Sequence, residues 1–133
     1  MNTMQVDIVT PERKVFEGQA TMVIARGIEG ELGILPGHTP LVTPLKIGAL
    51  QVKEGTTDRL IAISGGFLEV RPDKVTVLAE TAELPEEIDI DRAQQAKERA
   101  EKRLAELKKG DVEFEINERA LARAINRLQV RKK

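Results

Sequence analysis

The groups in this sequence best suited to chemistry are carboxylates and arginines that gather around one predicted helix start. The stretch from Glu83 to Ala93 reads E-L-P-E-E-I-D-I-D-R-A and supplies both kinds of charge. Arg92, Arg99 and Arg103 fall near one face of that helix, and Arg123 lies four residues before Arg127 later in the chain. Guanidinium groups donate paired hydrogen bonds to phosphate oxygens, and a helix N-terminus adds partial positive charge. The pattern therefore predicts a phosphate site.

A plainer interpretation of these charges stays open. They can be solvated ion-pair positions on a surface helix, of which Glu98 and Lys102 are an example, beside an ordinary helix cap. Spacing alone fits either interpretation. A ligand bound between the predicted helices and the last predicted strand would distinguish the two.

Groups that carry catalysis are nearly absent. Ser64 is the only serine, and its setting A-I-S-G-G lacks the glycine two residues earlier that a nucleophile elbow requires. His38 is the only histidine and there are no cysteines, so the sequence predicts neither a metal site nor a disulfide. No G-x-x-x-x-G-K-[ST] or G-x-G-x-x-G pattern occurs. We therefore expect a non-catalytic protein, and the sequence disfavours the hypothesis of a small-molecule enzyme.

The overall composition limits the classes of partner. With 133 residues and a formal net charge of -1, the chain lacks the basic excess of a general nucleic-acid binder. It has no tryptophan or tyrosine on which single-stranded bases could stack. No apolar run approaches the roughly 18 residues of a membrane span, and the first residues lack the pattern of a signal peptide. We therefore expect a soluble, cytoplasmic protein with no nucleic-acid role.

One end of the chain is strongly basic. Every charged residue after Glu118 is positive. A one-sided basic segment attracts an anionic partner, whether a protein, a nucleotide or a lipid headgroup. The candidate residues for such contacts are Arg119, Arg123, Arg127, Arg131, Lys132 and Lys133.

Residues 1–84 are predicted to form a β-rich domain. Short apolar runs separated by turns recur at near-regular spacing, which is typical of a β-sandwich or barrel. Expected strands include 4–8, 15–16, 20–25, 45–52, 60–63 and 74–82. The passage 30–42 is predicted as an apolar loop or a broken strand. Its prolines, together with Pro44 just beyond, exclude it from a central position in a sheet.

Residues 85–133 are predicted to form two helices, so the fold class is α+β. Asp89 or Asp91 can cap the first helix. It should run to about Lys109, where Gly110 stops it. The second helix follows Asp111, and two helices joined by a short glycine turn form an antiparallel hairpin.

This hairpin should be weakly held. Its seam is largely alanine, and each buried CH₂ contributes only about 0.8 kcal/mol. If the arginine faces of the two helices meet, their like charges repel and oppose packing of the hairpin. A polyanion bound between them would turn this repulsion into attraction. The sequence therefore predicts a two-state element whose closed form an anionic ligand stabilises.

From end to end the chain resembles the epsilon subunit of bacterial F-type ATP synthases. Three stretches carry the resemblance: G-E-L-G-I-L-P-G-H-T-P-L-V at 30–42, I-S-G-G-F-L-E-V at 63–70 and I-D-I-D-R-A at 88–93. The last is similar to the I/L-D-x-x-R-A motif for ATP in Bacillus-type members. The resemblance implies an N-terminal ten-stranded β-sandwich followed by a C-terminal antiparallel two-helix hairpin. It also implies a non-catalytic place in the central stalk of a proton-translocating complex, at the cytoplasmic face of the cell membrane.

The same resemblance implies partners and regulation. The sandwich would bind the gamma subunit, its loop would contact the membrane c-ring, and the basic end would meet the catalytic beta and alpha subunits. The helices would inhibit ATP hydrolysis when extended along gamma and release it when folded onto the sandwich. ATP would favour the folded form as a regulatory ligand, and no cofactor would be required.

Site residues carried over from the family fall into two sets. The implied ATP contacts are Glu83, Ile88, Asp89, Arg92, Ala93, Arg99, Arg123 and Arg127. The implied c-ring contacts are Glu31, Leu32, Gly33, Ile34, Leu35, Pro36, Gly37 and His38. From the residues alone, the apolar members of the second set could form an exposed patch or fold back into the core.

A second function remains as the alternative. The chain could be a β-sandwich adaptor whose basic helical tail binds an acidic protein partner, with no nucleotide role. Truncation of the tail would then remove partner binding, and nucleotides would have no effect.

Overall fold

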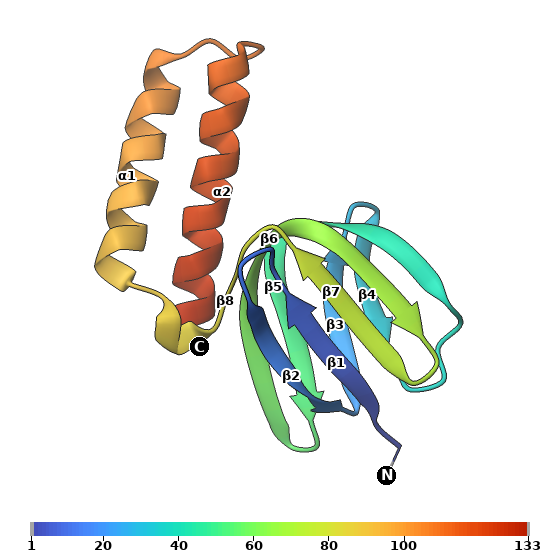
Figure 1. Ribbon diagram of the computed structural model, residues 1–133. Coiled ribbons are helices and arrows are strands. Elements are labelled where there is room, and N and C mark those ends of the chain that lie inside the picture. Colours follow the sequence, from blue (N-terminus) through green and yellow to red (C-terminus); the bar gives the residue numbers. More distant parts are fainter. Residues whose placement is uncertain (1, 133) are drawn as a thin grey trace.

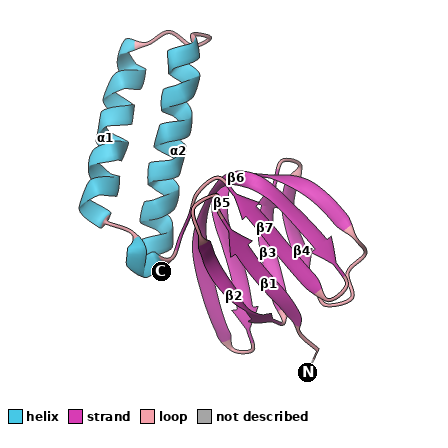
Figure 2. Ribbon diagram, viewed as in Figure 1, coloured by secondary structure: helices cyan, strands magenta, loops and turns pink. Residues whose placement is uncertain are grey.

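A computed structural model of the chain describes residues 2–132 as a β-sandwich with a helical hairpin beside it (Figure 1). The strands are β1 Met4–Val9, β2 Lys14–Ala20, β3 Met22–Gly27, β4 Gly30–Ile34, β5 Leu41–Glu54, β6 Thr57–Arg71, β7 Lys74–Ala79 and β8 Ala82–Glu83. The helical elements are the 3-10 helix η1 Pro85–Glu87, α1 Ile90–Glu106 and α2 Val112–Lys132. All of these strands precede all of these helices, as predicted for an α+β fold (Figure 2).

The strands form one hydrogen-bonded sheet that folds over into two layers (Figure 1). Its order is β2-β1-β7-β6-β5-β3-β4, and β8 adds a short pairing to β6. β1 and β7 are parallel, whereas the other neighbours are antiparallel. The largest fully buried side chains include Met4, Ile8, Ile34, Leu50, Ile61 and Leu68. The core therefore consists of the apolar residues that alternate along these strands.

The sheet passes from one layer to the other at a corner of the β5–β6 hairpin. In β6, residues of odd number such as Ile63 face the core before the corner, and residues of even number such as Leu68 face it afterwards. Gly65 and Gly66 lie between them with φ angles of 78° and 124°. Positive φ is readily accessible to glycine, so these two residues allow the strand to bend without a break.

Within residues 2–132 the sheet has eight strands, so the expectation of ten strands is wrong. The physical reason is continuity, because β5 has 14 residues, β6 has 15, and the two stay paired on both sides of the corner. Each therefore contributes to both layers as a single strand. The expected two-layer sandwich followed by a helical hairpin is confirmed.

The glycine-rich passage is part strand and part loop. β4 pairs with β3 and places Ile34 in the core, with Leu32 packed against it. Leu35, in the loop just after β4, is 56% exposed. Pro44 lies in β5 next to β6, and pairing with β3 begins only at Leu45, so Pro44 occupies an edge as its missing N–H requires.

α1 begins where local rules predict. Asp89 is its N-cap, and the Oδ1 atom of Asp89 accepts a hydrogen bond of 3.1 Å from the backbone N–H of Arg92. The helix ends at Glu106, a little before the expected end near Lys109, because the backbone becomes extended at the next residue. Gly110, with φ of 105°, lies in the turn to α2.

α2 provides the main contact between the hairpin and the sandwich. Val130 is fully buried in a small apolar cluster with Ile88 and Ala62, and Ala49 and Leu60 pack at its edge. α2 packs against β5 and β6, whereas α1 packs against α2. Figure 1 accordingly shows α2 standing between α1 and the sandwich.

Candidate functional site at the hinge

An ion pair between Glu83 and Arg127 closes the hinge between the two parts of the chain. The Nε atom of Arg127 donates to the Oε1 atom of Glu83. β8 holds Glu83 in place by pairing with Ala62 of β6, and α2 carries Arg127. The two side chains, of Arg127 and Glu83, are 30% and 29% exposed. The pair is therefore partly shielded from solvent and links α2 to the last strand.

Beside this pair lies a small crevice between α2 and β6, with a volume of about 10 Å³. The Nδ2 atom of Asn126, a buried residue, donates to the carbonyl oxygen of Ile63 at 3.4 Å. Arg123 lines the same crevice as Glu83 and Arg127. Three of the predicted ATP contacts thus come together, in a space far smaller than the roughly 300 Å³ of a small ligand pocket.

The other predicted ATP contacts lie outside this crevice. Ile88 and Ala93 are buried, and the side chain of Asp89 is engaged as the N-cap of α1. Arg92 and Arg99 are exposed on α1, and they line neither the crevice nor the larger clefts that flank the hinge. Of the four arginines in the predicted set, only Arg123 and Arg127 therefore lie at this crevice.

Two of the arginines on these helices, Arg103 and Arg127, lie against carboxylates. The Nη2 atom of Arg103 lies 2.6 Å from the Oε2 atom of Glu113, and its Nη1 atom lies 3.3 Å from the Oε2 atom of Glu106. Glu113 belongs to the first turn of α2, so this contact joins the two helices at their tip. A carboxylate therefore offsets the positive charge of Arg103 and of Arg127, and the predicted repulsion among the arginines stays a prediction.

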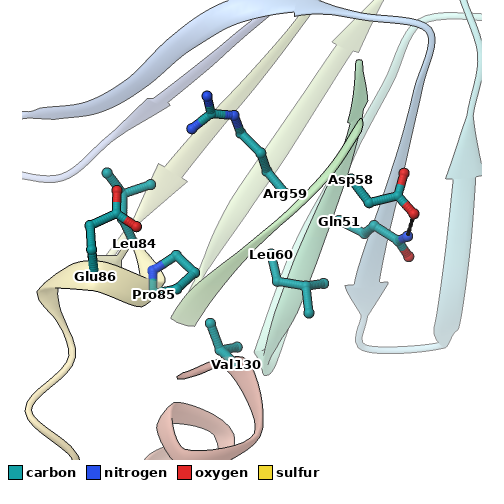
Figure 3. A pocket seen from close by; sticks show the side chains of 8 residues that line it. All are labelled: Gln51, Asp58, Arg59, Leu60, Leu84, Pro85, Glu86 and Val130. Atoms are coloured by element: carbon teal, nitrogen blue, oxygen red, sulfur yellow. Dashed lines mark hydrogen bonds between the residues drawn. The ribbon is translucent and has the colours of Figure 1, made fainter. Parts of the chain in front are cut away.

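A cleft of about 390 Å³ flanks the hinge on the other side (Figure 3). Its walls come from β5, β6, η1 and the end of α2, where Val130 closes it. Gln51 donates to Asp58 at 3.0 Å, and Arg59 pairs with Glu54 at 2.7 Å, so these polar groups already have partners. Sequence reasoning missed this cleft because its walls are far apart along the chain.

An exposed apolar row on the outer face of the sheet was also missed. Phe67 of β6 lies opposite Leu78 of β7 and Pro44 of β5, and Val42 follows on the same face. Val42, Phe67 and Leu78 are each more than half exposed. Contiguous exposed apolar side chains mark interaction surfaces. We call these residues the apolar row (Val42, Pro44, Phe67 and Leu78). A pattern of strict alternation did not predict it, because the residues that face outward change from even to odd numbers at the β5–β6 corner.

The predicted basic end does not behave as one surface. Arg119, Arg131 and Lys132 are exposed, Arg123 is half-buried beside the sandwich, and Arg127 is paired. Lys133 lies outside the described residues. The basic groups of α2 therefore divide between the sandwich and solvent.

The structure offers no metal site and no membrane-spanning helix within residues 2–132. This part of the chain has no group of three or more His, Asp or Glu residues able to hold a metal ion. The Nδ1 atom of His38 lies 2.6 Å from the carbonyl oxygen of Thr39, within the loop itself. None of the helices in this part combines the length and apolar character of a membrane span.

A β-sandwich joined by a charged hinge to a helical hairpin defines a known class of ATP synthase subunit. The model for the beta-sandwich domain of the ATP synthase delta/epsilon chain matches residues 3–85. The model for the long alpha-helix domain of the same chain matches residues 86–132. The chain belongs to this delta/epsilon family, whose members are non-catalytic subunits.

Within the family, the similar curated proteins are epsilon chains. The ATP synthase epsilon chain of Halalkalibacterium halodurans is 57% identical over 130 residues, which cover 98% of each chain. That of Brevibacillus brevis is 63% identical over 107 residues, which cover 80% of this chain and 81% of the relative. The resemblance to epsilon subunits is therefore confirmed over essentially the whole chain.

Solved structures agree with this assignment. A chain in the cryo-EM structure of the Euglena gracilis mitochondrial ATP synthase, with OSCP, F1 and c-ring, matches with a TM-score of 0.76 and 27% identity. The match covers 90% of this chain and 76% of that one. A chain of the Tetrahymena thermophila mitochondrial ATP synthase central stalk and c-ring matches with a TM-score of 0.55 and 13% identity, which supports the fold alone.

Proposed function

We propose that this chain is the epsilon subunit in the central stalk of an F-type ATP synthase, held at the cytoplasmic face of the cell membrane through its partners. The observation that carries the proposal is the similarity to epsilon chains along nearly the full length of both proteins. We take residues 1–84 as the unit that binds the rotor and residues 85–133 as the regulatory unit. Gamma, the c-ring and the catalytic alpha and beta subunits are the proposed partners.

In this proposal the sandwich binds gamma through the apolar row. Its exposed side chains belong to three neighbouring strands, which form a rigid platform of fixed register. Burying such side chains against another protein removes apolar surface from water, which favours association by roughly 25 cal/mol per Å² before the cost of binding. Purified gamma should therefore capture the full chain and lose it when the row is made polar.

The loop from Glu31 to His38 is proposed to contact the c-ring. Leu35 supports this assignment because it is exposed, with Ile28 of the neighbouring turn exposed as well. Ile34 is buried and would act by holding the loop to the core. Leu35→Gln should weaken assembly with the c-ring in a reconstituted complex, and Leu32→Gln should instead lower the stability of the sandwich.

The helical unit is proposed to inhibit ATP hydrolysis when it leaves the sandwich, with ATP favouring the packed form. Glu83, Arg123 and Arg127 support a ligand-responsive hinge, since they meet where α2 joins the last strand. The proposed ATP contacts also include Ile88, Asp89, Arg92, Ala93 and Arg99. Because the proposed contacts belong to both helices, a bound ATP would engage arginines of α1 and of α2 at the same time.

A melting experiment tests the nucleotide response. ATP should raise the melting temperature of the isolated full chain, because a ligand that binds only the folded form stabilises it. Arg92→Gln should abolish the increase, and Arg131→Gln, an exposed arginine at the end of α2, should preserve it. An unchanged melting temperature in millimolar ATP would contradict the nucleotide response while leaving the subunit assignment in place.

The adaptor alternative differs in one measurable respect. It is favoured by the ion pair between Arg127 and Glu83. That arginine already has an anionic partner within the chain, so it does not need a nucleotide. Removing residues 119–133 would then abolish binding to an acidic partner, and ATP would change neither binding nor melting. Under the epsilon proposal, the same truncation leaves binding to gamma through the sandwich intact.

A further inference from the structure

A second cleft opens above the hinge, between α2 and the corner of the sandwich. Its volume is about 400 Å³, within the range of small-ligand pockets. Lys46 and Gly65 of the corner form one wall, and Arg119 and Arg123 of α2 form the other. Ser64 lines both this cleft and the crevice beside Glu83, so the two spaces adjoin.

The charges that line this cleft are predominantly positive. Lys46, Arg119 and Arg123 are three cations, and Glu80 is the one carboxylate that accompanies them. Within residues 2–132, none of the three cations forms an ion pair within 4.0 Å, in contrast to Arg127. An excess of unpaired cations in a recessed space attracts an anion more strongly than the same charges do on an open surface.

The backbone holds these cations in a defined arrangement. Arg119 and Arg123 are four residues apart on α2, so they project from successive turns of one helical face. Lys46 lies at the corner opposite Gly65, between the paired residues that flank it in β5 and β6. Asn126 fixes α2 on the sandwich one turn further along, through its bond to the carbonyl of β6.

We propose that this cleft is an oxyanion site in which Lys46 and Arg119 act together with Arg123 to bind the phosphate groups of a polyphosphate. The occupant is a nucleoside triphosphate or an inorganic polyphosphate, because both present several adjacent anionic oxygens that guanidinium groups can bind. Two of the binding residues belong to α2 and one belongs to the sandwich. A bound polyphosphate therefore links the second helix directly to the sandwich without using the arginines of α1.

For the nucleotide, this inference rests on the proposed function and deepens it. It places the phosphates on the sandwich side of α2, and it adds Lys46 and Arg119, which lie outside the ATP contacts that the family resemblance implies. It also gives Glu80 a defined role, since its negative charge repels the ligand and lowers the affinity of the site.

The experiment measures the affinity of the full chain for sodium tripolyphosphate and for ATP by calorimetry and thermal shift. Lys46→Gln and Arg119→Gln should each weaken tripolyphosphate binding by roughly tenfold, which is typical for loss of one charge-assisted hydrogen bond. The matched controls Lys102→Gln and Lys109→Gln, both at exposed positions outside the cleft, should keep the affinity of the unmodified chain. Glu80→Gln should increase the affinity, which a general loss of stability could not do.

The outcomes separate this site from the nucleotide response. Equal tripolyphosphate affinities in the cleft variants and the controls would overturn the site, as would a lack of binding by the unmodified chain. If ATP binds and only Arg92→Gln abolishes its effect, the proposed function stands and the cleft is rejected. If tripolyphosphate binding depends on Lys46 and Arg119 while ATP has no effect, the oxyanion site stands and the nucleotide response is rejected.

Discussion

Arg127 of α2 forms an ion pair with Glu83 of β8, across the point where the sandwich gives way to the helices. The two residues are far apart in sequence, and the contact exists only while α2 lies against the sandwich. It is therefore a direct indicator of the packed state. Its partial burial makes it more sensitive to substitution than the more exposed pairs of the helices, such as Arg103 with Glu106.

A double-mutant cycle should measure this contact. Arg127→Gln and Glu83→Gln should each lower the free energy of unfolding, and the double variant should lose less than the sum of the two. We expect a coupling of about 0.2–1 kcal/mol, typical of partly exposed ion pairs. Urea unfolding followed by circular dichroism provides the measurement. Strictly additive losses would show that the two side chains do not interact in solution.

The corner of the sheet should tolerate no side chain at Gly66. A Cβ atom there would lie 2.1 Å from the carbonyl oxygen of Leu78, and φ at this position is 124°. Gly66→Ala should therefore lower the free energy of unfolding by about 2–4 kcal/mol.

Gly55→Ala is the matched control for this substitution. Gly55 also has a positive φ, of 66°, but a Cβ atom added there would project into open space, with no contact within 4 Å. Gly55→Ala should lower the free energy of unfolding by about 1 kcal/mol, from backbone strain alone. Equal losses for the two variants in thermal or urea unfolding would contradict the steric role of the corner.

Acid should weaken the sandwich through Asp7. The hydrogen bond of 3.1 Å from Gln5, followed by the contact with Lys74 at 3.3 Å, holds the pKa of Asp7 below its ordinary value despite burial of the group. A lowered pKa in the folded state contributes stability that is fully present above the unfolded pKa of about 3.9. That contribution is lost as the pH falls through the folded pKa.

The matching variant is Asp7→Asn. Its deficit in unfolding free energy relative to the unmodified chain should be greatest near neutral pH and should shrink as the pH falls below about 4. Urea unfolding at a series of pH values provides the measurement. Asp111→Asn, at an exposed position in the turn between the helices, is the control. A deficit for Asp7→Asn that stays constant with pH would indicate that the carboxylate charge is not involved.

The apolar row should matter for binding more than for folding. Phe67 is 53% exposed, so Phe67→Gln should change the free energy of unfolding by no more than about 0.5 kcal/mol. Capture by purified gamma should nevertheless weaken by roughly tenfold or more, because aromatic side chains often dominate interfaces. Val112→Gln on the exposed end of α2 is the control and should bind normally. Unimpaired capture of Phe67→Gln would place the gamma contact elsewhere.

Local features of this protein could be predicted from its sequence. The cap at Asp89 was predictable because it depends on a side chain and a backbone N–H only three residues away. The strand alternation around Val6 and Ile8 was predictable because one face of a strand packs into the core. The grouping of Glu83 with Arg127 came from the family resemblance, since no spacing rule links residues so distant.

Features that depend on tertiary packing were less accessible. The count of ten strands came from the family resemblance, and it failed because β5 and β6 each pass through the corner as a single strand. The ion pair of Arg103 with Glu113 was not predicted, because it forms across the turn that joins the two helices. The cleft at Lys46 and Arg119 could not be anticipated, because its two walls meet only once α2 lies against the sandwich.

The position of α2 between α1 and the sandwich fixes an order of events. α1 packs mainly on its partner helix, so it has little independent attachment to the rotor-binding half beyond its connecting hinge. Release of α2 at Val130 would consequently free both helices together. Detachment of α1 alone would leave α2 bound to the sandwich. Only the release of α2 would carry its basic groups away from the sandwich. The contact between α2 and the sandwich is therefore the one that a regulator has to control.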